Sequence, residues 1–176
     1  GWAALGNSGW SYKEVLPYFK RSENHAQVDT MDKSYHGDSG ELGVTLPTRF
    51  KTPFVSGFIA ACTAVGIPHT ADYNGSKQEG AGVVHSTIEN GKRASGASAF
   101  LKPILKRSNL TTITYAQVGK LILEGKKVVG VQYIKGKKTV QVNADKEVIL
   151  SAGAFQSPQL LMLSGIGDAS ELNIHG

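Results

Sequence analysis

The residues best suited to ligand chemistry lie late in the chain, where a short apolar run meets a helix-like run. Residues 147–153 predict a strand that is buried on both faces, because they lack the alternation of a half-exposed strand. Ser157-Pro158 are typical of an N-cap and a first helical residue. A helix that follows a strand offers free N–H groups and a positive dipole end to an anion or a carbonyl oxygen. Gly153 has no Cβ, so we expect it to allow close approach of a ligand, although packing alone also explains such a glycine.

Acid–base and metal chemistry have few candidates in this sequence. The five histidines share no metal-ligand spacing; they are His25, His36, His69, His85 and His175. His36 lies between Tyr35 and Gly37 and predicts a hydrogen-bonding turn residue, whereas His85 predicts a satisfied or exposed strand residue rather than a base. Cys62 is the single cysteine, so the chain can form neither an internal disulfide nor a cysteine-based zinc site. We therefore predict no metal site.

Composition places the chain among ordinary globular proteins. Its 176 residues are 40% hydrophobic and 19% charged, which allows a core and speaks against disorder. The net charge is +5, and the excess lies in short lysine clusters beside glycine, at 126–127 and 135–138. These clusters predict solvated hairpin tips and no nucleic-acid partner. No run of 18 apolar residues occurs, which predicts no transmembrane segment, and the start at Gly1 without Met leads us to expect the true N-terminus elsewhere.

The first part of the chain predicts a loop-rich mixture of helices and strands. Ser11 and Glu14 have the spacing of a capping box, and Pro17 is expected to interrupt or end the helix that they start. Residues 53–64 carry apolar side chains at helical spacing, and Gly66 is expected to end that helix. The other expected elements are a loop over 24–40, strands over 42–46 and 83–88, a turn at Asn90-Gly91 and a helix over 95–101.

After Asn109 the pattern changes to alternating β-branched runs that are separated by Gly-Lys turns. This pattern predicts an antiparallel meander that leads into the buried strand and the last helix, which Gly165 is expected to end. The expected strands of the meander are 110–114, 118–123, 128–134 and 139–142. Ligands in α/β sheets bind at the carboxyl ends of strands, which again points to residues 151–153.

A longer match gives these elements an identity. Residues 153–167, GAFQSPQLLMLSGIG, closely resemble the second signature of the glucose-methanol-choline (GMC) oxidoreductase family, with Gln156 where Asn or Gly is more usual. Further matches to the family occur in order and at similar spacing; they are 2–7, 9–12, 16–19, 35–37, 72–75, 90–93 and 107–110. Together the matches cover essentially the whole chain, which makes the resemblance specific.

The resemblance implies an FAD-dependent oxidoreductase that oxidises a small-molecule alcohol by hydride transfer to the flavin. The electron acceptor stays open. The implied fold is α/β (α+β), in which part of a Rossmann-like FAD-binding domain with an antiparallel β-meander joins part of an α+β substrate domain. The implied division is 1–39 as a segment linked to the FAD domain, 40–108 as a substrate-domain portion and 109–176 as an FAD-domain portion.

The resemblance implies that four residues contact the cofactor. The backbone of Val118 would contact the adenine edge, which leaves its side chain free to pack in the meander. Ser151, Ala152 and Gly153 would line the dinucleotide crevice. No catalytic residue is assigned, because the family's His near its C-terminus and its Gly-x-Gly-x-x-Gly loop have no counterpart in this sequence. We therefore expect a fragment that lacks N- and C-terminal parts of the same enzyme and is inactive alone.

A second interpretation stays open, namely a truncated or non-catalytic α+β module without a cofactor. The flanking coding sequence separates the two, because a Gly-x-Gly-x-x-Gly upstream and a His-containing signature downstream support the enzyme. The compartment also stays open, with cytoplasm or membrane periphery favoured over secretion. We expect the isolated chain to be poorly stable, because the strand over 148–151 needs parallel neighbours that the chain does not supply.

Overall fold

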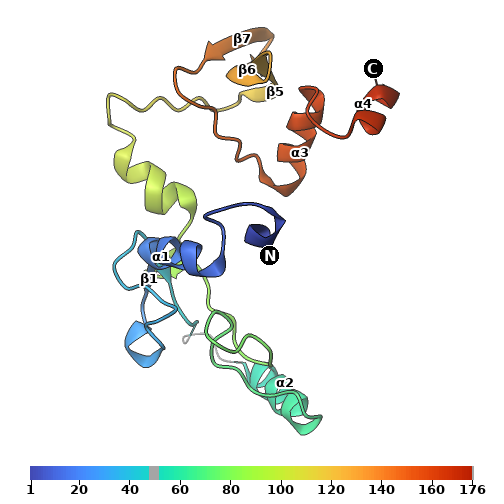
Figure 1. Ribbon diagram of the computed structural model, residues 1–176. Coiled ribbons are helices and arrows are strands. Elements are labelled where there is room, and N and C mark those ends of the chain that lie inside the picture. The colour runs from blue at the N-terminus through green and yellow to red at the C-terminus, as the bar shows by residue number, and fades with distance from the viewer. Residues whose placement is uncertain (48–51, 176) are drawn as a thin grey trace. The chain divides into compact units, whose positions relative to one another are not determined.

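The computed structural model describes residues 1–47 and 52–175. It divides into two compact units, Gly1–Leu110 and Thr111–Gly176. The first unit contains η1 (Trp2–Leu5), α1 (Tyr12–Ser22), β1 (Glu23–His25), η2 (Val28–Thr30), β2 (Leu42–Val44), α2 (Pro53–Ala64), β3 (Ile88–Glu89), β4 (Lys92–Arg93), η3 (Ala97–Leu101) and η4 (Lys102–Ile104) (Figure 1). The second unit contains β5 (Gln117–Glu124), β6 (Lys127–Lys135), β7 (Lys138–Asn143), α3 (Gly153–Leu163) and α4 (Ala169–His175).

Helix α1 starts at a capping box, as the sequence predicts. The Glu14 carboxylate accepts hydrogen bonds from the hydroxyl of Ser11 at 2.6 Å and from its backbone N–H at 2.9 Å, and both bonds lower the pKa of Glu14. The expectation that Pro17 interrupts or ends the helix is wrong, because α1 continues to Ser22. Pro17 removes the hydrogen bond to the carbonyl of Lys13, and Lys13 is exposed, so water can solvate that carbonyl.

Two short strand pairs lie in the first unit. β1 and β2 pair in parallel, with His25 opposite Val44. β3 and β4 form an antiparallel hairpin whose turn residues, Asn90 and Gly91, have φ of 50° and 73°. Positive φ at both central positions is the requirement of a type I′ turn, which Asn-Gly favours. The predicted turn is therefore confirmed.

Three other expectations for this unit need correction in detail. Of the strand expected over 83–88, the structure contains only the bridge between Ser86 and Thr45 and the start of β3. The strand β2, which precedes Thr45, is only three residues long. The loop expected over 24–40 includes the end of β1 and the 3-10 turn η2. The helix expected over 95–101 consists of the π-helical η3, and the 3-10 turn η4 follows it.

Helix α2 has the predicted span. Thr52 caps its start through its side chain, and Pro53 takes the first helical position. At its end, the N–H of Gly66 donates to the carbonyl of Thr63 at 3.0 Å and the N–H of Ile67 donates to the carbonyl of Cys62 at 3.0 Å. This pair of bonds is a Schellman motif. The motif needs a left-handed residue, and Gly66 supplies it with φ 90°.

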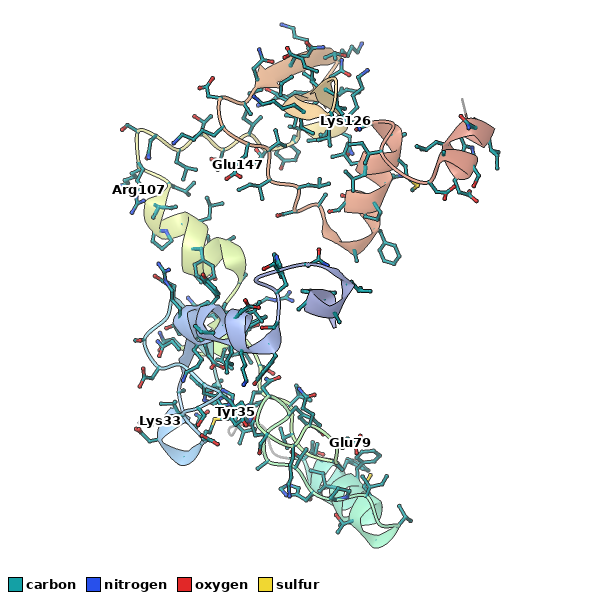
Figure 2. The ribbon with its side chains drawn as sticks, viewed as in Figure 1. Lys33, Tyr35, Glu79, Arg107, Lys126 and Glu147 are labelled. Atoms are coloured by element: carbon teal, nitrogen blue, oxygen red, sulfur yellow. The ribbon has the colours of Figure 1, made fainter. Side chains whose placement is uncertain are left out.

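The second unit is built on a three-stranded antiparallel meander in the order β5, β6, β7. Its turns contain Gly125 and Gly136, with φ of 60° and 61°, so the glycines stand where other residues would be strained. A register shift after Val118 leaves Gly119 without a partner on β6, which makes a β-bulge. The lysine clusters are exposed at the hairpin tips, as Lys126 shows in Figure 2. The three strands and both turns lie where the alternating pattern predicts them.

Helix α3 packs on β5 and provides the small core of the second unit. Leu160 of α3 and Leu121 of β5 are buried. The hydroxyl of Ser164 joins the two elements, because it accepts from the N–H of Leu121 at 2.8 Å and donates to the carbonyl of Leu160 at 2.6 Å. Gly165, with φ 78°, ends α3 as predicted, and its N–H donates to Met162 at 2.9 Å.

Two strands expected in this unit do not occur among its described residues. Residues 110–114 and 147–151 carry no regular structure and pair with no strand; Glu147 marks the second segment in Figure 2. Ile149 is 78% exposed, so the expectation of a strand buried on both faces is wrong for this chain. Such a strand satisfies its N–H and C=O groups through neighbours on both sides, and the described residues provide none.

Helix α3 also begins earlier than predicted. It starts at Gly153, with φ 92°, and not at Pro158. Ser157 lies inside the helix, where its hydroxyl accepts a hydrogen bond from the N–H of Ala152 at 3.0 Å. Pro158 leaves the carbonyl of Ala154 without its helical donor, and Ala154 is exposed to water. The Ser157 hydroxyl therefore stabilises the start of α3, and Pro158 is tolerated inside the helix without starting it.

Candidate functional site

Five ionisable side chains from distant parts of the sequence meet in the first unit. They are Glu23, His25, His36, Asp72 and His85, and we call them the histidine cluster. His25 and His36 are 2% and 3% exposed. Their rings meet edge to face, with centroids 5.4 Å apart. His25 and His36 are the two most deeply buried polar residues among residues 1–47 and 52–175.

His36 bridges the two carboxylates of the cluster. Its Nδ1 lies 3.1 Å from Oε2 of Glu23, and its Nε2 lies 2.9 Å from Oδ2 of Asp72. Each ring nitrogen faces a carboxylate oxygen, so the ring links the two carboxylates. The N–H of Gly37 adds a bond to Glu23 at 2.9 Å. This arrangement places a buried imidazole ring between two partly buried carboxylates.

The electrostatics of Asp72 agree with this arrangement. Partial burial by itself raises the pKa of the Asp72 carboxyl. The N–H of Asn74, which donates to Asp72 at 2.9 Å, and the hydrogen bond and charge of His36 outweigh that effect, so the pKa lies below its ordinary value. Asp72 is thus held as a carboxylate.

His25 and His85 form a second pair, and neighbours fix the tautomer of His25. The N–H of Gln27 donates to Nδ1 of His25 at 3.1 Å, so the ring proton lies on Nε2. That Nε2 lies 3.1 Å from Nδ1 of His85 and donates to it. Burial, and next the electrostatic effect of His85, lower the pKa of His25, and the nearby carboxylates oppose this less strongly. His25 is therefore held neutral.

The lowered pKa of His25 predicts a loss of stability in mild acid. Below the ordinary histidine pKa of about 6.5 the unfolded chain takes up a proton that the folded chain resists, so stability falls as the pH falls. One such proton changes stability by at most ~1.4 kcal/mol per pH unit. We expect the decline in thermal midpoint from pH 7 to pH 5 to be shallower in His25→Gln than in the wild type. His69→Gln, at an exposed histidine, is the control, and equal slopes in all three proteins would contradict the assignment.

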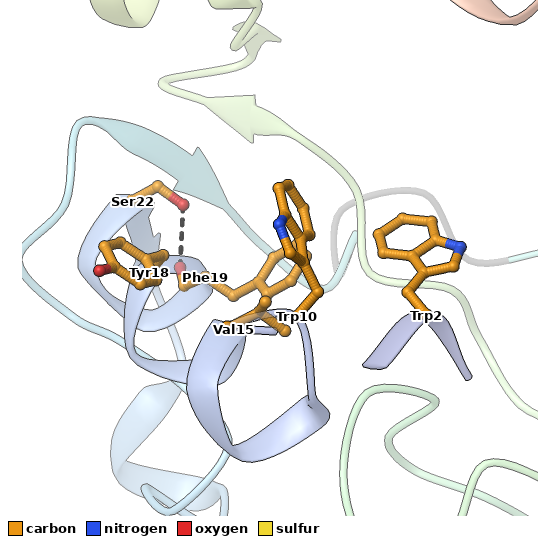
Figure 3. A pocket seen from close by; sticks show the side chains of 7 residues that line it. Trp2, Trp10, Val15, Tyr18, Phe19 and Ser22 are labelled. Atoms are coloured by element: carbon orange, nitrogen blue, oxygen red, sulfur yellow. Dashed lines mark hydrogen bonds between the residues drawn. The ribbon is translucent and has the colours of Figure 1, made fainter. Parts of the chain in front are cut away.

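The second candidate site is an aromatic groove in the first unit. Trp2, Trp10, Tyr18 and Phe19 line a space of about 560 Å³ at the start of α1 (Figure 3). The rings of Trp2 and Trp10 pack edge to face, with centroids 5.7 Å apart. The lining includes no carboxylate, histidine or thiol. The groove can hold an apolar group, but its own side chains offer no acid or base at neutral pH.

The third candidate is the start of α3, where the cofactor-contact residues were predicted. Ser151, Ala152 and Gly153 are all exposed, and no side chain caps the helix start. A Cβ added to Gly153 would meet no atom within 4 Å, so the space in front of the turn is open. The structure brings the end of α3 onto β5, whereas the predicted contact residues lie at its start. Val118 lies half-buried on β5 beside the bulge.

Metal and membrane sites find no support in the described part of the chain. Residues 1–47 and 52–175 contain no group of three or more His, Cys, Asp or Glu side chains that could hold a metal ion. Within the same residues, every helix is too short or too polar to cross a membrane.

The paired strands, the helices and the glycine turn define a portion of a mixed α/β protein in which the start of α3 is open. Residues 1–175 match the family model described as GMC oxidoreductase. The chain therefore belongs to the GMC oxidoreductase family, as the signature over 153–167 indicates.

Relatives in two bacteria share the whole chain at high identity. The chain is 44% identical over 180 residues to an oxygen-dependent choline dehydrogenase of Rhizobium etli (strain CIAT 652), and the match covers 99% of this chain and 31% of the relative. It is 43% identical over 175 residues to an oxygen-dependent choline dehydrogenase of Brucella anthropi, with the same coverage. The chain thus spans about a third of the length of the relatives it matches.

Two solved enzyme structures have a fold similar to that of this chain. An FAD-dependent oxidoreductase from Chaetomium thermophilum superposes with a TM-score of 0.85 at 31% identity, over 98% of this chain and 32% of that one. Pyridoxine 4-oxidase from Mesorbium loti superposes with a TM-score of 0.80 at 32% identity, over 96% of this chain and 32% of that one. Both matches cover 96% or more of this chain, so each includes most residues of both units.

Sequence reasoning missed the histidine cluster as a group. His36 forms hydrogen bonds as predicted, but it follows the turn over 33–35 instead of lying in it, and His85 is satisfied by His25. Neither prediction links the two histidines. Glu23 precedes His36 by 13 residues and Asp72 follows it by 36. No local period joins such positions, so their contact depends on the pairing of β1 with β2 and on the path of residues 66–86.

Proposed function

We propose that the chain is the central part of an FAD-dependent oxidoreductase that oxidises the CH–OH group of a small alcohol by hydride transfer to the flavin. The observation that carries this proposal is the family match over residues 1–175. Two further findings support it. The relatives named above are choline dehydrogenases, whose named substrate is an alcohol. The solved structures of similar fold include a protein named as an FAD-dependent oxidoreductase.

The residues at the start of α3 fit a dinucleotide. The uncapped helix start offers N–H groups and a positive dipole end, which suit a phosphate or a flavin carbonyl. Gly153 leaves open space in front of the turn, so a cofactor can approach the backbone. We assign Ser151, Ala152 and Gly153 to the lining of the dinucleotide crevice on this basis.

Val118 completes the proposed contacts through its backbone. A strand end next to a bulge has N–H and C=O groups that the ladder leaves partly free, and such groups can read an adenine edge. The half-buried side chain of Val118 packs in the meander at the same time. In this assignment residues 109–176 belong to the FAD-binding domain, 40–108 to the substrate domain and 1–39 to a loop and helix segment that is linked to the FAD-binding domain.

The division of chemical work follows from these assignments. Bound FAD supplies the hydride acceptor, and the residues of this chain bind and orient it. The phosphate cradle and the base that takes the alcohol proton come from parts of the polypeptide outside residues 1–176, because the sequence contains no Gly-x-Gly-x-x-Gly and no catalytic residue is assigned here. Choline is the first alcohol to test, and the electron acceptor is oxygen or another oxidant.

Flavin absorbance of the full-length protein tests the proposal. We expect a yellow protein with one FAD per chain, whose visible flavin absorbance is lost when an alcohol is added without oxygen, because the alcohol reduces the flavin. Chain 1–176 alone should bind no stoichiometric flavin. A colourless full-length protein, or a coding region that stops on both sides of this chain, would favour the module without a cofactor.

Replacing Gly153 by Ala should weaken FAD binding about tenfold in the full-length protein. Alanine at φ 92° costs ~1–2 kcal/mol and puts a methyl group into the space that the cofactor needs. Fluorescence titration of the deflavinated protein with FAD measures the dissociation constant. Gly165→Ala is the matched control, because it imposes a similar backbone strain at φ 78° at the other end of α3. Equal losses in the two variants would remove Gly153 from the cofactor site.

A further inference from the structure

Helix α2 is the least covered helix of the first unit. None of its side chains is buried, although Phe54 and Phe58 are large and apolar. Phe54 is 86% exposed, Phe58 is 68% exposed, and Val65 at the C-cap is 77% exposed. No Lys, Arg, Asp or Glu occurs from Thr52 to Ala71. Figure 1 shows α2 as the turquoise helix.

The distribution of these side chains is not that of a surface helix. A helix on the surface of a globular protein has an apolar stripe toward the core and charged residues toward water. α2 has no charged residue on any side, and its polar members are small ones such as Ser56 and Thr63. A helix that is apolar all round is normally buried within a large protein.

We infer that α2 is a core helix, and that its cover is the part of the same polypeptide that lies outside residues 1–176. The inference rests on the proposed function, because it needs the longer enzyme. The matched relatives are about three times as long as this chain, so a protein of their length has ample chain to enclose a helix of 12 residues. Enclosure on several sides is what the all-round apolar surface requires.

Two other covers fit α2 less well. A second copy of the protein would meet one face of the helix and leave the opposite face in water. A helix that lies in a membrane surface has a polar face rich in Lys and Arg, which α2 lacks, and a helix that spans a membrane needs about 20 residues. Thiol labelling distinguishes a second copy and a membrane from enclosure by the same polypeptide.

Thiol labelling around the helix tests the inference in the full-length protein. Residues 60 to 63 follow one another at about 100° around the helix axis, so four probes sample all sides. The probes are Cys62 itself and, in a Cys62→Ser background, Ala60→Cys, Ala61→Cys and Thr63→Cys. Iodoacetamide labelling is read by mass spectrometry on the peptide that contains α2, so cysteines elsewhere do not interfere. Lys137→Cys, at an exposed hairpin tip, is the positive control.

We expect all four α2 probes to react at least about a hundredfold more slowly than in urea, while Lys137→Cys reacts at a similar rate in both conditions. Fast labelling of any one side in the full-length protein overturns enclosure by the same chain. Protection that disappears on dilution assigns the cover to a second copy, and protection that appears only with lipid vesicles assigns it to a membrane. Protection already present in chain 1–176 assigns it to the second unit. Flavin absorbance of the same samples reports the proposed function separately.

Discussion

Replacing His36 by Leu should destabilise the first unit by about 2–5 kcal/mol. The change removes the buried ring that links Glu23 and Asp72, and it leaves two partly buried carboxylates without their partner. Each hydrogen bond to a charged group contributes about 1.5–3 kcal/mol, and a partly buried carboxylate that loses its partner stays desolvated. Native-state hydrogen exchange of the β1 and β2 amides in the full-length protein measures the free energy of local opening.

His69→Leu is the matched control for this variant. His69 lies in the same unit and is exposed, so the same substitution should change the local opening free energy by less than ~0.5 kcal/mol. If His36→Leu left the β1 and β2 amides as well protected as they are in the wild type, the bridge between Glu23 and Asp72 would have no structural role.

Replacing Leu160 by Ala should destabilise the second unit by about 2–5 kcal/mol. Leu160 of α3 is 7% exposed and Leu121 of β5 is 5% exposed, and they are the buried apolar residues of these two contacting elements. The truncation leaves a cavity that so thin a core cannot fill by collapse. Hydrogen exchange of the β5 amides reports the effect, and the N–H of Leu121, which donates to Ser164, should lose the most protection.

Leu160→Met separates packing from other effects at this position. Methionine has nearly the same volume, so we expect a loss below ~1.5 kcal/mol. Similar losses in the Ala and Met variants would show that the shape of Leu160, and not the volume that it fills, determines the stability of the α3–β5 contact.

Local rules predicted those elements whose partners lie close in the sequence. The meander over 117–143 was predictable because its alternation and its two glycine turns specify antiparallel neighbours directly. The same holds for the hairpin turn at Asn90-Gly91 and for the ends of α2 and α3, where glycine alone takes a left-handed conformation cheaply. Each of these features is decided by a few consecutive residues.

The errors concern features that depend on distant partners or on competing local signals. Residues 147–151 have the composition of an inner strand, but a strand exists only where neighbours bond to it. Pro17 is typical of a helix end and Pro158 of a helix start, yet both lie inside helices. The helices tolerate them because water can solvate the carbonyl that loses its hydrogen bond. Of the candidate sites, the turn at Gly153 was predictable from local sequence, and the histidine cluster was not.

The two edges of the meander differ in what they offer to another strand. Along β5, the outward N–H of Leu121 is already taken by Ser164, and α3 packs against the strand. Along β7, nearly all residues are exposed, and no described strand lies beyond it. Backbone groups on an open edge can recruit any extended segment, and Lys138 is the single charged residue of β7 that opposes this. The sheet can therefore grow more easily past β7, so incorrect strand additions during biosynthesis should begin at that edge.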